Sequence, residues 1–178
     1  MGIPTLISTA TASGASSVDI TSGIDSTYDE YMFVCTDVGP VEDTATFTFQ
    51  FNAAGGSGFN ETITSTMFFA HNNEAGNDAS LGYDVNNDQA QGTAYQGFWI
   101  EGGNGSDESG VGILNLFNPS STTYVKHFYY RAHSYYASDY AFSHFGAGYI
   151  NTTAAIDEIS FKMNSGNFDG VIQLYGIA

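Results

Sequence analysis

Strict alternation of apolar and polar residues is the feature that most constrains the fold of this chain. In the segment TATFTFQFN, residues 44–52, an extended backbone would place Phe47, Phe49 and Phe51 on one side and the Thr and Gln residues on the other. This period of two indicates a half-buried β-strand, whereas the apolar residues of an amphipathic helix recur every three or four positions. The segment therefore predicts a strand whose phenylalanines enter a core.

Many other segments have the same character, and helical periodicity is hard to find. The further predicted strands are residues 5–10, 28–38, 63–70, 111–118, 124–130, 144–150, 156–163 and 171–177. Clusters of Gly, Asn, Asp and Ser separate them and supply turn chemistry. These features predict an all-β, single-domain antiparallel β-sandwich or jelly roll of roughly eight to ten strands, with long Gly/Asn/Asp-rich loops.

The length of 178 residues fits one domain spanning residues 1–178, and no linker or repeat divides it. Residues 1–15 are a candidate for an extended N-terminal arm. Residues 78–103 leave three alternatives open, namely a helical turn, a strand pair or a long loop. Long loops in compact domains often carry binding sites.

The charge balance excludes several partner classes. The chain has 19 Asp and Glu against three Lys and Arg, which gives a net charge of -16. Binding to phosphate backbones or anionic membranes needs clustered cations, so we expect no nucleic-acid and no membrane partner. No signal peptide or membrane-length apolar run is recognisable, which fits synthesis in a cytoplasm. The single cysteine, Cys35, is expected to be a small buried hydrophobe.

Two of the three cations lie in one aromatic segment, FNPSSTTYVKHFYYRAHSYY, residues 117–136. Period-two alternation places His127, Tyr129, Arg131 and His133 on one face of a strand and Lys126 on the other. The segment lacks the nucleophile and the orienting carboxylate that catalysis by these groups would need. We expect a strand whose cations pair with carboxylates of the domain itself or of a neighbouring subunit.

No convergent catalytic or metal-binding set is recognisable elsewhere. The four histidines are scattered, without the short spacings typical of zinc ligands. The run Asp84-x-Asn86-x-Asp88 copies the start of a calcium loop, but Gln89 and Tyr95 occupy the positions of the turn glycine and the bidentate glutamate. We therefore predict no enzyme activity, no cofactor and no dedicated metal site, with weak calcium binding at residues 84–88 left open.

Three stretches of the chain resemble virion structural proteins of tailed bacteriophages, chiefly those of cyanobacteria and other marine bacteria. They are ISTATASGASSVDITSGIDSTYDEYMFVCTDVGP, LFNPSSTTYVKHF and GYINTTAAIDEISFKMNSGNFDGVIQLYGI. The most specific parts are IDSTYDEYMF, NPSSTTYVKH and the closing SGN-x-x-x-G-x-I-x-LYGI. In that family such domains occur as stand-alone proteins and as tips of tail fibres, and they carry no known catalytic residues.

The resemblance implies a non-enzymatic protein of the virion, assembled on the phage particle. No long fibre segment precedes the domain in this sequence, which favours a capsid decoration or cement protein over a tail fibre. Decoration proteins bind as symmetric copies, so the implied partners are the chain itself, commonly as a homotrimer, and the major capsid protein or other virion proteins. The candidate subunit-interface residues are Lys126, His127, Tyr129, Arg131 and His133.

Two rival functions remain. A tail-fibre, spike or head-fibre component would bind host-surface glycan, with Tyr95, Trp99, Tyr135 and Tyr136 stacking on sugar faces. Trp99 also fits a core position within Phe98-Trp99-Ile100. A depolymerase acting through scattered carboxylates is the other rival, and no paired carboxylate geometry is evident from the sequence to favour it.

Overall fold

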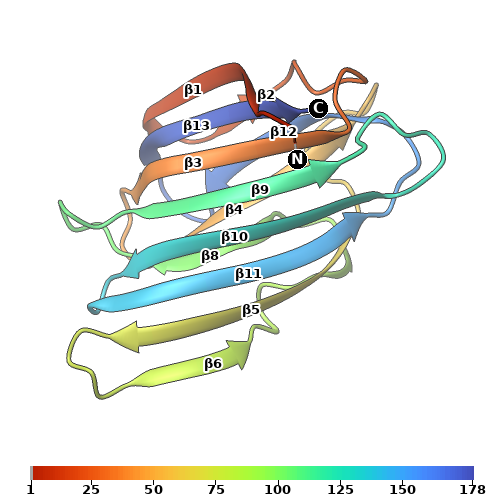
Figure 1. The fold of residues 1–178 in the computed structure, drawn as a ribbon. Coiled ribbons are helices and arrows are strands. Elements are labelled where there is room, and N and C mark those ends of the chain that lie inside the picture. Colours follow the sequence, from red (N-terminus) through yellow and green to blue (C-terminus); the bar gives the residue numbers. More distant parts are fainter. Residues whose placement is uncertain (1) are drawn as a thin grey trace.

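The computed structural model describes residues 2–178, and all of its regular structure is antiparallel β-strand (Figure 1). The strands are β1 (Thr5–Ala15), β2 (Val18–Ile20), β3 (Glu30–Pro40), β4 (Ala45–Ala53), β5 (Ile63–Asn73), β6 (Ala79–Tyr83), β7 (Ala90–Gly92), β8 (Gln96–Gly102), β9 (Gly110–Phe117), β10 (Lys126–Tyr136), β11 (Tyr140–Ile150), β12 (Ile156–Met163) and β13 (Phe168–Ile177). The all-β prediction is confirmed. Within residues 2–178 there is no helix suited to crossing a membrane.

Eight of the strands form a jelly roll. One layer has the order β1-β13-β3-β9, and the facing layer has the order β2-β12-β4-β8. Each pair of neighbours is antiparallel, and among these eight strands the chain passes between the layers at β1–β2, β2–β3, β3–β4, β8–β9, β9–β12 and β12–β13. This is the double Greek-key arrangement of four strands per layer that defines a jelly roll.

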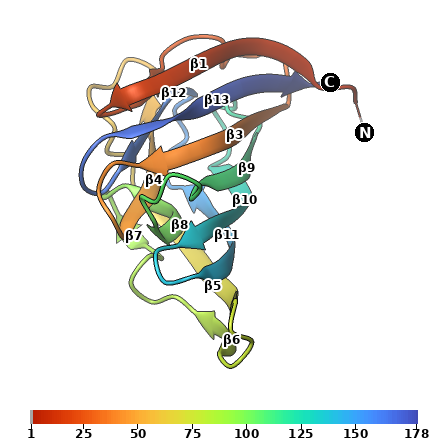
Figure 2. The same ribbon diagram turned by 90° about the vertical axis from the view of Figure 1, so that its left-hand side faces the viewer.

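Two insertions enlarge the first layer. The β5–β7 segment follows β4, the β10–β11 hairpin follows β9, and together they continue the layer as β9-β10-β11-β5-β6. We call the resulting layer, from β1 to β6, the large sheet, and the layer β2-β12-β4-β8 the small sheet. The large sheet outgrows the small one, so that β5 and β6 extend past β8 (Figures 1 and 2).

Aromatic side chains fill the space between the sheets. The ring of Phe47 on β4 stacks on Phe161 of β12, with 5.8 Å between centroids, and Phe49 meets Phe128 of β10 edge-on at 5.5 Å. All four rings are buried. Burial of side chains this large dominates the stability of a core.

Strand β4 departs from the half-buried strand predicted for residues 44–52, because every residue of Ala45–Ala53 is buried. Its polar face lies beneath neighbouring loops rather than in water. The Gln50 side chain is fully buried and donates hydrogen bonds to the carbonyl oxygens of Glu61, Thr93 and Ala94. Alternation identified the two faces correctly but did not reveal that loops cover the polar one.

The remaining differences concern short or terminal elements. Thirteen strands are present rather than eight to ten, because β2 and β7 have only three residues each and carry little sequence pattern. The region 78–103, left open by the sequence, holds β6, β7 and β8. In the segment named as a candidate N-terminal arm, residues 5–15 form β1, which pairs with β13 at the edge of the sheet, and Met1 lies outside the described residues.

Candidate functional site

Strand β10 presents the predicted cationic face to the exterior. Its exposure alternates along the strand, with His127, Tyr129, Arg131 and His133 exposed and the residues between them buried. Hydrogen bonding to β9 on one side and β11 on the other fixes this orientation. The predicted division of the strand into two faces is therefore confirmed.

Lys126 does not belong to this surface. Its side chain is fully buried and donates hydrogen bonds to the carbonyl oxygens of Thr152, at 3.3 Å, and Ala154, at 2.5 Å. Burial lowers the pKa of Lys126, while the nearby Glu61 carboxylate opposes that effect. We correct the predicted interface set by removing Lys126, which is engaged within its own chain.

The exposed residues of β10 lie in the middle of a broad outer face of the large sheet. We define this outer face by the outward side chains of β3, β9, β10, β11 and β5. The strand registers align one row straight across it, consisting of Val34, Ile113, Arg131, Phe145 and Phe68. Exposure remains high for such apolar residues, at 43% for Ile113 and 45% for Phe68. Contiguous exposed apolar surface of this kind is typical of interaction sites.

Arg131 has no carboxylate partner on this face. Its guanidinium carbon lies 5.2 Å from the centroid of the Phe145 ring, which is a cation–π contact. The single ion pair within residues 2–178 joins His71 and Asp78, so Arg131 takes part in none. Partial burial lowers the pKa of His133, which favours the neutral imidazole at pH 7 and leaves Arg131 as the full positive charge of the face.

A groove of about 330 Å³ runs beside Arg131. It crosses β3, β9 and β10 and reaches Ser143 of β11. Its lining includes Val34 and Thr36 from β3, Val111 and Ile113 from β9, and Arg131, Ala132 and His133 from β10. Its walls are mainly apolar, and on the β10 side Arg131 supplies positive charge beside the neutral imidazole of His133. Sequence reasoning missed the contribution of β3 and β9, because nothing local to those strands indicates that they flank β10.

Carboxylates are absent from the centre of the outer face and occur in the connections at the ends of the sandwich. None of the outward residues between 32–36, 64–72, 111–117, 127–133 and 143–149 is Asp or Glu. The antiparallel registers bring four connections to one end, which we call the acidic end: residues 41–44, 74–78, 103–109 and 137–139. Each of the four carries carboxylates, and none contains Lys or Arg.

The structure does not assemble the four predicted glycan-stacking residues into one platform. Trp99 is fully buried against Phe47, so its assignment as a stacking residue is wrong and its core assignment is confirmed. Two glycines make room for the indole, since a Cβ on Gly102 or Gly110 would lie 2.3 or 2.6 Å from its ring. Tyr95 is instead covered by Lys162, whose Nζ lies 4.1 Å from the ring centroid.

The other two predicted stacking tyrosines lie at the acidic end. Tyr135 donates its hydroxyl to Glu74 and Asp139, each at 3.1 Å, and the hydrogen bond to Glu74 raises the pKa of the phenol above its usual range. Tyr136 packs edge-on against Tyr140 at 5.6 Å. Tyr135 thus serves as a donor to carboxylates that lack cationic partners.

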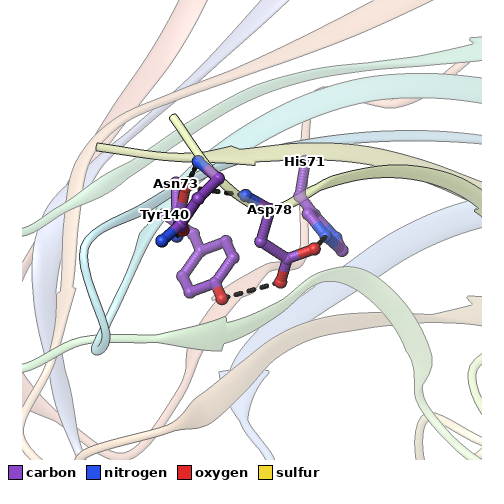
Figure 3. A network of polar contacts seen from close by, with 5 residues as sticks. His71, Asn73, Asp78 and Tyr140 are labelled. Atoms are coloured by element: carbon purple, nitrogen blue, oxygen red, sulfur yellow. Dashed lines mark hydrogen bonds and ion pairs between the residues drawn. The ribbon is translucent and has the colours of Figure 1, made fainter. Parts of the chain in front are cut away.

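A related network holds the β5–β6 hairpin to β11 (Figure 3). Tyr140 donates its hydroxyl to one oxygen of Asp78 at 2.9 Å, and His71 lies 3.7 Å from the other oxygen. Asn73 accepts the backbone N–H of Asp78 and so closes the hairpin. Within residues 2–178 no three His, Cys, Asp or Glu side chains converge as metal ligands.

A second cleft, of about 370 Å³, lies where β5 and β6 extend past β8. It is lined by Thr46, Phe69, Tyr83, Asp84, Val85, Asn86, Asn87, Ile100 and Glu101. Asp84 is not free to bind calcium in this arrangement. One of its oxygens accepts the backbone N–H groups of Asn86 and Asn87, and the other accepts the Asn87 side-chain amide.

Comparison with known proteins adds no assignment, because no protein-family model, curated protein or solved structure matches this chain.

Proposed function

We propose that this protein is a non-enzymatic structural component of a tailed-phage virion, a capsid decoration or cement protein bound as symmetric copies on the head. The observation that supports this proposal best is the outer face of the large sheet. It is broad, apolar and cationic at its centre, in a chain that is otherwise strongly acidic. The proposal includes no catalytic step, no cofactor, no nucleic acid and no membrane.

The state of Arg131 supports a protein partner for this face. An arginine within an acidic chain ordinarily finds a carboxylate, yet the one ion pair of residues 2–178 lies elsewhere. Carboxylates from another chain would form ion pairs with the Arg131 guanidinium. Electrostatic complementarity of this kind selects partners and fixes their register. The implied partners are further copies, as a homotrimer, and the major capsid protein or another virion protein.

The remaining surface suits a densely decorated particle. A net charge of -16 keeps copies soluble and repels stray nucleic acid. Jelly rolls occur in viral capsid proteins and in lectins, so the topology is compatible with the proposal without selecting it.

The deciding experiment is the copy number of the protein in purified virions, relative to the major capsid protein, by quantitative mass spectrometry. A near-stoichiometric ratio supports lattice-wide decoration. A few copies per particle favour a fibre or spike, and absence from purified particles contradicts a virion role.

Replacement of Arg131 by Ala tests the proposed surface directly. We expect the monomer to keep its thermal stability, because the side chain is exposed and its cation–π contact contributes only about 0.5–1 kcal/mol. Self-association or particle binding should weaken. An R131A variant that assembles and binds particles as well as the unaltered protein would contradict the proposal.

A tail-fibre, spike or head-fibre component that binds host glycan is a second candidate, favoured by the cleft beside β8. Phe69 and Tyr83 offer aromatic surface, and Asn86 and Glu101 offer groups for sugar hydroxyls. The carboxylate-rich surroundings favour a neutral saccharide over an anionic one.

Saturation-transfer NMR with a panel of neutral mono- and disaccharides tests this second candidate. We expect Y83A and E101Q to reduce the transfer and Y124A, which removes an exposed tyrosine outside the cleft, to leave it unchanged. No transfer to the unaltered protein, or equal loss in Y124A, argues against a glycan site in this cleft.

A further inference from the structure

We infer that the groove beside Arg131 receives the turn formed by Val41, Glu42 and Asp43 of a second copy of the chain. This inference rests on the proposed self-assembly and identifies the surface that meets the outer face. The supporting observation is that the groove and the turn, which lie on different faces of the molecule, are complementary in charge and in apolar surface.

The groove offers an apolar wall beside positive charge. Val34, Val111 and Ile113 line it from β3 and β9, and Arg131 and His133 close one side from β10. A fitting partner therefore combines an exposed apolar side chain with adjacent free carboxylates. Any such segment must also lie at the surface and be preformed, because ordering a mobile loop reduces affinity.

Few segments of the described chain meet these requirements. The large apolar side chains that are exposed outside the outer face are Ile3, Leu6, Val41, Leu81, Tyr83, Val85 and Tyr124. Of these, only Val41, Tyr83 and Val85 have a carboxylate as a sequence neighbour, and for the latter two that neighbour is Asp84. Asp84 is buried, and backbone and side-chain amides occupy its oxygens.

The Val41–Asp43 turn has the required chemistry. Val41 is 52% exposed, Glu42 and Asp43 follow it directly, and both are exposed. Within the described residues Glu42 forms no side-chain hydrogen bond, whereas one Asp43 oxygen accepts the N–H of Thr44. Two carboxylates beside one apolar side chain complement the positive charge of Arg131 beside an apolar wall.

The turn is also held in place before binding. The backbone N–H of Val41 donates to the carbonyl of Asn167 at 2.9 Å, and the Asn104 side chain donates to the carbonyl of Val41 at 3.1 Å. These contacts tie the turn to two neighbouring loops and leave the Val41 side chain exposed.

The geometry of the contact is head-to-tail. The turn lies at the end of β3 that belongs to the acidic end, and the groove lies on the outer face across β3, β9 and β10. Different surfaces of two copies meet, so each copy offers one free turn and one free groove. Such a contact closes into a ring when its rotation permits, which agrees with the expected trimer.

Charge exchange tests this contact by sedimentation velocity over a concentration series. We expect E42R and R131E each to weaken self-association by about tenfold or more, and the double variant E42R/R131E to recover most of it, because the pair is restored with reversed sign. D107R is the matched control, since it makes the same kind of change at an exposed carboxylate of the acidic end outside the turn. Circular dichroism melting verifies that each variant folds.

The outcomes separate this inference from the proposed function. If E42R weakens association no more than D107R, or if the double variant recovers nothing, the turn is not the occupant, although self-assembly through the outer face stands. A monomeric unaltered protein across the concentration series overturns the inference. The virion role is then decided independently by copy number.

Discussion

The Lys126 ammonium donates a hydrogen bond to the carbonyl oxygen of Ala154, which ties the start of β10 to the loop between β11 and β12. The same group also bonds to the carbonyl of Thr152. One cation of the basic segment therefore stabilises the fold from inside, while Arg131, five positions further along, faces outward. The two cations point to opposite sides of the strand because their positions differ by five, an odd number.

Replacement of Lys126 by Met should destabilise the protein by about 1–3 kcal/mol, since two carbonyl oxygens lose their donor in a partly buried loop. Urea unfolding measures the change. The matched control is K162M, which removes only the contact with Tyr95 and should cost at most about 1 kcal/mol. Equal effects of the two substitutions would contradict the structural role of Lys126.

Substitution of Gly110 by Ala should lower the stability by about 1–3 kcal/mol, because the added Cβ would lie 2.6 Å from the Trp99 ring. Thermal melting provides the measurement. At Gly39 the nearest atom to an added Cβ is 3.8 Å away, so G39A should be close to neutral. A neutral G110A would show that Trp99 is not packed as described.

His144 should make the protein less stable in mild acid. Burial lowers its pKa to about 3, with a smaller contribution from the charge on His133, so the folded state keeps it neutral. In the unfolded chain His144 takes up a proton below about pH 6.5, so above that pH this residue does not reduce the free energy of unfolding. As the pH falls from about 6.5 toward 3, the free energy of unfolding decreases by about 1.4 kcal/mol per pH unit.

The pH effect is measured by urea unfolding at pH 7 and pH 5. Between these values the unaltered protein should lose about 2 kcal/mol more than H144Q, in which the buried group no longer titrates. The comparison cancels the contributions of the other histidines and of the carboxylates. Identical pH dependence of the two proteins would mean that His144 is not protected from protonation.

Calcium should not stabilise the fold through residues 84–88. Asp84 already accepts three hydrogen bonds from amide groups, and Asp88 accepts the hydroxyl of Tyr83. We therefore expect millimolar calcium to leave the melting temperature unchanged, by differential scanning fluorimetry with magnesium as the control. A calcium-specific rise that D84N abolishes would show that this loop rearranges to bind the ion.

Part of the candidate site was predictable from local pattern. Alternation placed Arg131 and His133 on one face and Lys126 on the other, because successive side chains of a strand point to opposite sides. Lys126 was predicted to be an interface residue because of its charge. Its position places it on the buried face of the strand, together with Phe128 and Tyr130. For Trp99 the sequence left two assignments open, because aromatic chemistry alone suits both a core and a sugar platform, and the structure places it in the core.

The sequence by itself determined the strands, their two faces, the all-β class and the shortage of cations. These follow from backbone geometry and composition, which are local or additive properties. Only the tertiary structure decided which strands are neighbours, and hence that Val34, Ile113 and Arg131 line one groove and that the Val41 turn lies at the acidic end. Neighbours are set by hydrogen-bond pairing between distant strands, and period-two alternation fixes the face of a residue but not its partner across the sheet.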